Sequence, residues 1–469
     1  MMYLRMGRQS ECQQRSCLQN KFTFMIFQLI AFIIILYSFK NFKKAFLLFL
    51  LYDLFLNTNI NFLSIPGVPI LTVEDVLIMV FAAEFFIKYG TSKGGPYVQT
   101  RNNFPFKTPF IILTISWTIS TVFALVGFAG AVSAYVKQIL EYVIMTYLMW
   151  RIINDKRDLI FLLRGFTFLF LLCGIYELYE VATQSNPLSD YETSLVQDQT
   201  RAIDFGNYED EQDRGFRAKS VFSHPIGSGI NFGLYIIMAL FFLMKAKVNI
   251  KTNRLLVLAT CLLSLACIIM TKSRGPYLFT LIGIFSFVNL KSQKFYRYTI
   301  IMALALMVLL PYFSAQLDIF KSLFSADAQA KVGGSDANMR FDQLAVAVGI
   351  MSMSPLYGLG FKFLNEMSAA ITMGLLGSES IWFQVLPQFG IIGIIAYLFM
   401  IYWTLIKLPR KYKSSSIFFI GLAYWGVITL TSVPGMQIYL YYLALILVIK
   451  YQMGCFGEVK GDKGFLVKK

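Results

Sequence analysis

The sequence predicts an all-α, polytopic integral membrane protein, for three reasons. Of its 469 residues, 57% are hydrophobic and 14% are charged, whereas soluble globular chains are about 45–50% apolar and about 25% charged. Apolar runs of about eighteen residues, long enough to cross a hydrocarbon core, recur from end to end. The connectors between these runs are alternately rich and poor in lysine and arginine, as in a chain that crosses a membrane repeatedly.

The apolar runs are all expected to be helices, because an open strand leaves its backbone polar groups unsatisfied in lipid. About 12 or 13 transmembrane helices are expected, in a single transmembrane domain that covers residues 1–469. Both tails are basic and are expected to lie in the cytoplasm, which requires an even number of spans. Segment 22–63 is therefore expected to hold one span and one partial or interfacial helix. The runs lie near residues 22–39, 44–63, 73–89, 109–127, 131–150, 159–180, 225–244, 254–271, 276–290, 298–313, 380–406, 415–432 and 435–450.

The cations indicate which connectors face the cytoplasm. The formal net charge is +16, and the basic residues gather in alternate connectors, as lysines and arginines do on the cytoplasmic side of a membrane. They do not line one amphipathic face, so no nucleic-acid partner is expected. The remaining connectors are expected to face outward. Two of them, 181–224 and 314–379, are long enough to form large external loops.

The sequence contains no pattern for a metal or a cofactor. His224 is the single histidine, and the six cysteines are scattered along the chain without the spacing of zinc ligands or of a disulfide framework. No Walker-type glycine loop is present, which argues against ATP-driven transport. Any chemistry is therefore expected to depend on the chain's own side chains, with no metal and no cofactor.

Three outward stretches carry cations where the orientation rule expects few. The first ends the first long connector, which is acidic through most of its length and then turns basic at Arg214, Arg217 and Lys219. Ser223-His224-Pro225 opens the next helix, and serine before proline at a helix start is ordinary capping chemistry. His224 is therefore either an interfacial residue or a functional one.

The second stretch is the short turn Thr271-Lys272-Ser273-Arg274-Gly275-Pro276 between two expected spans. A guanidinium group in so short a turn has little room to reach bulk water. Arg274 is therefore expected to meet either an anionic ligand or a buried carboxylate. Lys272 is a secondary candidate for the same site.

The third stretch surrounds Arg340 in the second long connector. Residues 339–353 are expected to form an amphipathic helix on the outer leaflet, and the glycines of the following Pro355-Leu356-Tyr357-Gly358-Leu359-Gly360 allow a tight turn. Arg340 either binds a ligand or pairs with Asp342, and the sequence leaves both open.

An anionic ligand explains cations gathered on this face. A guanidinium group matches phosphate oxygens bidentately and stays charged at any working pH. A lipid-linked pyrophosphate presents such oxygens at the depth of the membrane surface. If a sugar leaves from it, two or three arginines can stabilise the charge that develops on the leaving group without a metal.

The three stretches resemble motifs of the O-antigen polymerase and O-antigen ligase family of bacterial surface-polysaccharide assembly. The resemblance covers residues 200–405 at the level of motifs and the whole chain at the level of topology. Three motifs carry it: Arg217 through His224-Pro225 with Gly227 and Gly229; the Ser-Arg-Gly turn at 273–275; and Arg340 with Pro355, Gly358 and Gly360.

One departure from the family pattern favours a polymerase. Ligases of this family typically carry a histidine eleven residues before the first glycine of a Gly-x-x-Gly helix start. Here the glycines are Gly390 and Gly393, and the corresponding residue is Glu379. A carboxylate can still accept a proton from a sugar hydroxyl, but the ligase histidine's role does not transfer directly.

The resemblance implies a GT-C-like glycosyltransferase in the bacterial inner membrane, with its active site facing the periplasm or exterior. The implied substrates are undecaprenyl-pyrophosphate-linked glycans, and the implied partners are membrane lipid and a chain-length regulator protein. Arg217, Arg274 and Arg340 are the expected pyrophosphate ligands, and Arg214, Lys219 and Lys272 are secondary candidates. Glu379 is the first candidate for the catalytic base, followed by His224 and Asp342.

Two other functions fit part of the pattern. An O-antigen ligase would use the same chemistry and transfer the glycan to lipid A core sugar, but Glu379 argues against it. A lipid-linked oligosaccharide flippase would also need cations that face a pyrophosphate. Its cations would line a cavity through the helices, whereas these arginines gather in the outward connectors.

Overall fold

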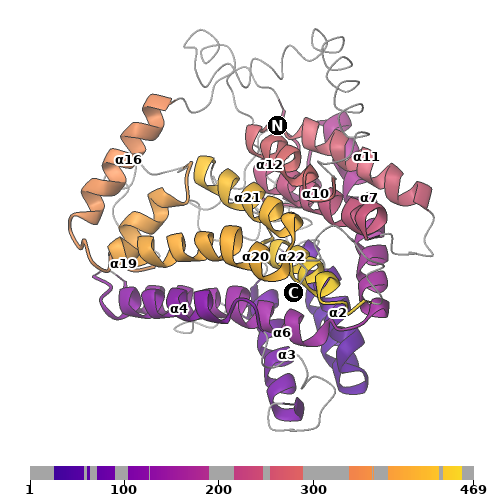
Figure 1. The fold of residues 1–469 in the computed structure, drawn as a ribbon, viewed down its shortest axis with the longest axis horizontal. Helices are drawn as coiled ribbons and strands as arrows, with labels where there is room; N and C mark the ends of the chain where they lie inside the picture. The colour runs from indigo at the N-terminus through magenta and orange to yellow at the C-terminus, as the bar shows by residue number, and fades with distance from the viewer. Residues whose placement is uncertain are drawn as a thin grey trace, which may run out of the picture. The chain divides into compact units, whose positions relative to one another are not determined.

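The computed structural model describes residues 26–56, 61–63, 71–89, 104–125, 127–189, 216–246, 254–288, 337–361, 363, 379–431 and 437–456. Helices dominate these ranges (Figure 1), which confirms the all-α class. The expected helix at 298–313 and most of the two long connectors lie outside the described residues. Two compact units divide the chain, Met1–Gly95 with Gln184–Tyr208 and Pro96–Thr183 with Glu209–Lys469. The single transmembrane domain over 1–469 stays a prediction.

The first unit contains a short helix where the sequence predicts a partial one. At about 1.5 Å per residue, the 11 residues of α2 extend about 16 Å, half the thickness of a hydrocarbon core. Residues 61–63 were expected to continue a helix and instead pair with 71–72 as an antiparallel ribbon. The elements are a helix at Ile26–Lys40, α2 (Phe42–Tyr52), η1 (Asp53–Phe55), β1 (Asn61–Leu63), β2 (Leu71–Thr72) and α3 (Val73–Tyr89).

The second unit contains helices at the expected runs from residue 109 onward, except for 298–313, which lies outside the described residues. Among the described residues, three continuous helices are long and apolar enough to cross a membrane: Lys156–Thr183, Pro225–Lys245 and Trp382–Tyr412. Its elements are α4 (Lys107–Val122), α5 (Phe128–Gln138), η3 (Ile139–Ile144), α6 (Met145–Ile152), α7 (Lys156–Thr183), α10 (Pro225–Leu240), η4 (Phe241–Lys245), α11 (Arg254–Met270), α12 (Arg274–Ile284), α16 (Ala337–Met351), α19 (Trp382–Tyr402), η7 (Trp403–Lys407), α20 (Leu408–Tyr412), α21 (Ser415–Leu430) and α22 (Ile438–Gln452).

Small residues bring α10 and α12 into close contact. A methyl group added at Gly229 of α10 would lie 2.5 Å from Pro276, and one at Gly283 of α12 would lie 2.0 Å from Ile237. Glycines let helix backbones approach closely where lipid provides no hydrophobic drive for association. The start of α10 is therefore held against the start of α12.

Helix α19 contains a break, and the connector after α16 repairs it. Gly390 has φ +59° and ψ −153°, which interrupts the helical hydrogen bonds on both sides. Residues 355–360 lie against the break and replace the lost bonds, as non-helical backbone in a membrane protein requires. Four backbone bonds join them: Leu359 N to Pro387 O (2.8 Å), Gly360 N to Gln388 O (3.0 Å), Ile391 N to Pro355 O (2.9 Å) and Ile392 N to Leu356 O (3.1 Å).

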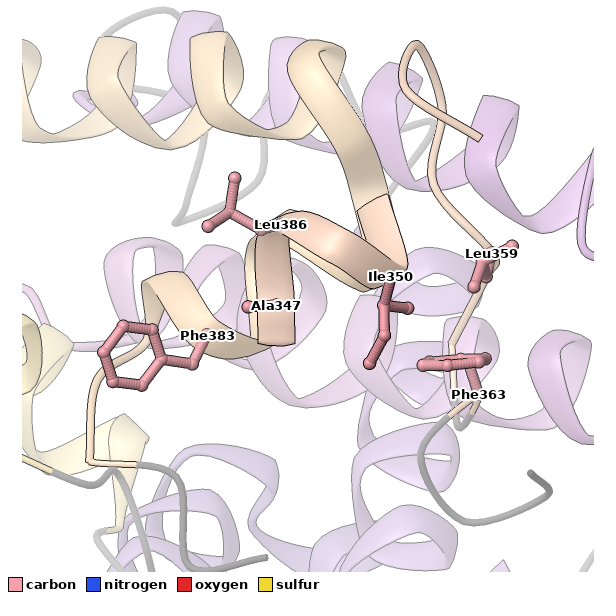
Figure 2. Packing of buried hydrophobic residues seen from close by; sticks show 6 residues of the cluster. All are labelled: Ala347, Ile350, Leu359, Phe363, Phe383 and Leu386. Carbon is pink, nitrogen blue, oxygen red and sulfur yellow. The ribbon is translucent and has the colours of Figure 1, made fainter. Parts of the chain in front are cut away.

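The helix expected at 339–353 is present as α16, and its inner face packs on α19. Figure 2 shows the buried apolar cluster that joins them, with side chains from both helices and from the connector between them. The cluster consists of Ala347, Ile350, Leu359, Phe363, Phe383 and Leu386. On the outer face of α16, Phe341, Leu344 and Val348 are exposed. Apolar side chains therefore occupy both faces of α16, and the expected amphipathic placement on the outer leaflet stays a prediction.

Candidate functional site

Three helices of the second unit begin close to the end of α21, and we call this region the site end. A methyl group at Gly275, in the first turn of α12, would lie 3.1 Å from Thr431 just after α21. Just before α19, the Ser380 hydroxyl donates to Thr429 O (2.8 Å), and Ile381 N donates to Ile428 O (2.9 Å). The starts of α12 and α19 therefore both contact the last turn of α21, and α10 joins them through its contact with α12.

Arg217 joins the first cationic stretch to the second. Its Nε donates to Thr271 O (3.2 Å), and its second guanidinium nitrogen donates to Ser273 Oγ (2.6 Å). Arg217 is only 9% exposed, and Ser273 directly precedes Arg274, the first residue of α12. The structure thus brings the Arg217 stretch against the turn that carries Arg274.

Two glutamates of α7, which the sequence reasoning missed, hold this arrangement. The buried Glu180 carboxylate accepts the backbone N–H groups of Lys219 (3.2 Å) and Ser220 (2.7 Å). Glu177, one turn earlier and fully buried, accepts a hydrogen bond from Ser228 in the first turn of α10 (3.4 Å). Two carboxylates one turn apart in an apolar span are the signal that could have revealed them, since intramembrane charges are rarely without a role.

His224 caps the start of α10. Its Nδ1 accepts the N–H of Ile226 (3.0 Å), and Pro225 occupies the first helical position. The capping residue is therefore His224, where the sequence suggested Ser223. Burial, together with the nearby cations Arg217 and Lys219, lowers the pKa of His224 to about 3. An imidazole with so low a pKa is a weak proton acceptor near neutral pH.

We predict that His224→Asn keeps the fold and changes its response to acid. Asparagine can accept the same backbone hydrogen bond at a cap. The pKa of His224 is about 3 in the folded chain, against 6.5 ordinarily. As the pH falls from about 6.5 to about 3, the unfolded chain therefore binds the extra proton first, and folded wild type loses stability. The variant lacks this loss, so thermal melting in detergent at pH 7 and pH 4 should show a smaller decrease for His224→Asn. Equal decreases would contradict the low pKa.

The third cationic stretch forms an ion pair with Glu379, the first candidate for the catalytic base. Arg340 of α16 donates to Glu379 Oε2 (2.6 Å), and the two side chains are 24% and 26% exposed. Asp342, the partner considered from the sequence, is exposed on the same helix. Arg340 therefore pairs with Glu379, in the connector just before α19, rather than with its near neighbour.

The Arg340–Glu379 pair lies at an open pocket of about 410 Å³. Its walls are mainly apolar and come from α16, the start of α19 and the end of α21. The lining residues are Arg340, Leu344, Glu379, Ser380, Trp382, Phe383, Leu386, Ile394, Thr429 and Leu430. A charged pair beside apolar walls suits an amphiphilic ligand that has both polar and apolar parts.

The remaining candidates are distributed as follows. Arg274 is partly exposed at the start of α12. Lys272 adopts a left-handed backbone conformation (φ +46°) in the turn before it, and burial and the Arg217 charge lower the Lys272 pKa. Lys219 is buried at the Glu180 contact. Arg214 lies outside the described residues.

Comparison with known families adds an independent observation to this geometry. Residues 259–398 match a family model described as O-antigen ligase. The match covers less than half of the chain, and it shows that this segment is similar to that family. Members of this family transfer glycosyl groups, and the family implies a ligase-like or polymerase-like function. The matched segment contains Arg274, Arg340 and Glu379, whereas Arg217 and His224 precede it. No curated protein matches the chain.

Proposed function

We propose that this protein is an O-antigen polymerase that joins undecaprenyl-pyrophosphate-linked repeat units by metal-independent glycosyl transfer. The site end would face the periplasm from the inner membrane, and a chain-length regulator would be a separate partner. The observation that carries the proposal is the attachment of Arg217 to the turn before Arg274. It puts two guanidinium groups beside the starts of α10 and α12, where helix dipoles also favour an anion.

In the proposed reaction, Arg217 and Arg274 bind the donor pyrophosphate. The bond between the anomeric carbon and the pyrophosphate oxygen breaks, and the arginines stabilise the negative charge on the leaving group. A hydroxyl of the acceptor's terminal sugar forms the new glycosidic bond and gives its proton to Glu379. Arg340 assists by holding the Glu379 carboxylate or by contacting the acceptor.

The geometry favours Glu379 over the other two candidate bases. Glu379 lies at a pocket large enough for a sugar, and its carboxylate is held in place by an ion pair with Arg340. His224 uses Nδ1 to cap α10 and has a pKa near 3. Asp342 is exposed and does not line the pocket.

The second candidate function is O-antigen ligase, because the matched family model carries that description. It uses the same donor and the same arginines, and it differs in the acceptor, which would be lipid A core sugar. Glu379 at the histidine position is the feature that favours the polymerase.

Reconstitution in proteoliposomes tests the choice. With lipid-linked repeat units alone, a polymerase yields a ladder of longer lipid-linked glycans. With core acceptor added, a ligase yields capped lipid and no ladder. A protein that only moves the lipid-linked unit across the bilayer, measured without acceptor, would be a flippase. Capped lipid or flipping in the absence of a ladder would overturn the polymerase proposal.

A further inference from the structure

We propose that Gln343 is a positioning residue for Glu379, and that α16 holds both the backbone and the carboxylate of this base. The inference rests on the proposed function, in which Glu379 accepts the proton of the acceptor hydroxyl. Glu379 lies outside any regular helix, so its carboxylate must be kept by other contacts in the orientation that proton transfer needs.

Two residues of α16 contact Glu379, in the connector before α19. Gln343 Oε1 accepts the backbone N–H of Glu379 (3.2 Å), and Arg340 donates to Glu379 Oε2 (2.6 Å). Arg340 and Gln343 are three residues apart, so they lie on the same face of the helix. That face continues with Ala347 and Ile350, which are buried against α19.

The residues after Glu379 are fixed from the other side. Ser380 and Ile381 bond to the carbonyl oxygens of Thr429 and Ile428 at the end of α21. Residues 379–381 are therefore held between α16 and α21 by three hydrogen bonds, two from backbone N–H groups and one from the Ser380 hydroxyl. A reacting group that is displaced by about 1 Å can lose about 100-fold in rate, so this degree of fixation fits a catalytic group better than an ordinary connector.

Unused donors on the same two side chains support a role toward substrate. Gln343 is 2% exposed, and its Nε2 finds no acceptor among the described residues; the same is true of Arg340 Nε. Buried polar groups without partners are rare in folded proteins. Arg340 lines the pocket together with Glu379, so a substrate oxygen brought to the base would supply an acceptor for the Arg340 Nε.

The test compares three variants in the polymerisation assay, with rates expressed per amount of folded protein. Gln343→Leu removes the acceptor for the Glu379 N–H and is expected to lower kcat by about 10-fold or more with little change in KM for the donor. Gln343→Glu keeps an acceptor oxygen and adds a negative charge beside Glu379. That charge should raise the pKa of the base and move the acid limb of the rate–pH profile to higher pH. Ala345→Leu, exposed on the opposite face of α16, is the matched control and should behave as wild type.

The outcomes separate this inference from the proposed function. Wild-type kcat in Gln343→Leu, or a loss of thermal stability alone, would overturn the positioning role while polymerisation by wild type continues. If Gln343→Leu does not fold, an unshifted acid limb in Gln343→Glu would have the same meaning. Full activity in Glu379→Gln would remove the base assignment, and a wild type that forms no polymer would remove the proposed function and this inference with it.

Discussion

Polymer formation by Arg274→Lys is expected to be about 100-fold lower than by wild type, the loss typical when one charge-stabilising donor is removed from a reaction centre. Lysine keeps the positive charge but lacks the planar fork that binds two phosphate oxygens at once. The start of α12, where Arg274 lies, is fixed by the contacts of Gly229 with Pro276 and of Gly275 with Thr431. A point charge at this position therefore cannot recover the second bond by a shift of the helix.

Arg217→Lys is expected to reduce polymer formation by a similar factor and also to lower stability. The guanidinium group of Arg217 makes two hydrogen bonds to the turn before α12, and an ammonium group in its place cannot keep both with the same geometry. Chain length on a glycan gel and thermal melting in detergent measure the two effects.

Arg254→Lys is the matched control for both arginine variants. Arg254 is exposed at the start of α11, and the turn that carries Arg274 follows the other end of this helix. The variant should polymerise as wild type. Wild-type chain length in both Arg217→Lys and Arg274→Lys would rule out the proposed binding of the donor pyrophosphate by these two arginines.

Helix positions could be predicted well because the signal for them is local. The run expected at 159–180 is the core of α7, and the run expected at 225–244 corresponds to α10 with η4. Length and hydropathy alone determine whether a segment can cross a membrane. The start of α10 was also evident, because proline at the first helical position needs no information from the rest of the chain.

The contacts between stretches could not be predicted in the same way. Arg340 is two residues from Asp342 and 39 from Glu379, and the only ion-pair partner that the sequence suggested for it was the near carboxylate. Helix geometry decides otherwise, because residues two apart on a helix do not face each other. Glu180 likewise receives the backbone N–H groups of residues about 40 positions away, a contact that no local pattern encodes.

The motif with Gly358 and Gly360 was recognised from the sequence, but the structural reason for it is visible only in the fold. A turn at Gly358 and Gly360 was expected because glycine permits positive φ, and both do have positive φ, +68° and +97°. What the motif did not reveal is that the turn completes the broken hydrogen bonding of α19 at Gly390. Two motifs that look separate in the sequence therefore form a single structural unit.

This unit makes Gly358→Ala the substitution with the largest expected effect on folding. A β-carbon there would lie 2.4 Å from the carbonyl carbon and oxygen of Gln388, and these backbone atoms cannot turn aside as a flexible side chain could. The left-handed backbone and the forced displacement should together cost about 3 kcal/mol or more. Thermal melting of purified protein should show a large decrease, or the variant should fail to accumulate in membranes.

Gly349→Ala is the matched control, because a β-carbon at this position of α16 meets nothing within 4 Å. It should be neutral or more stable by up to about 1 kcal/mol, since alanine favours a helix over glycine. Wild-type melting of Gly358→Ala would show that residues 355–360 do not need to lie against the α19 break. Because this connector also joins α16 to α19, partly folded Gly358→Ala should lose polymerisation beyond its loss of folded protein. The Arg340–Glu379 pair depends on those two helices keeping their packing.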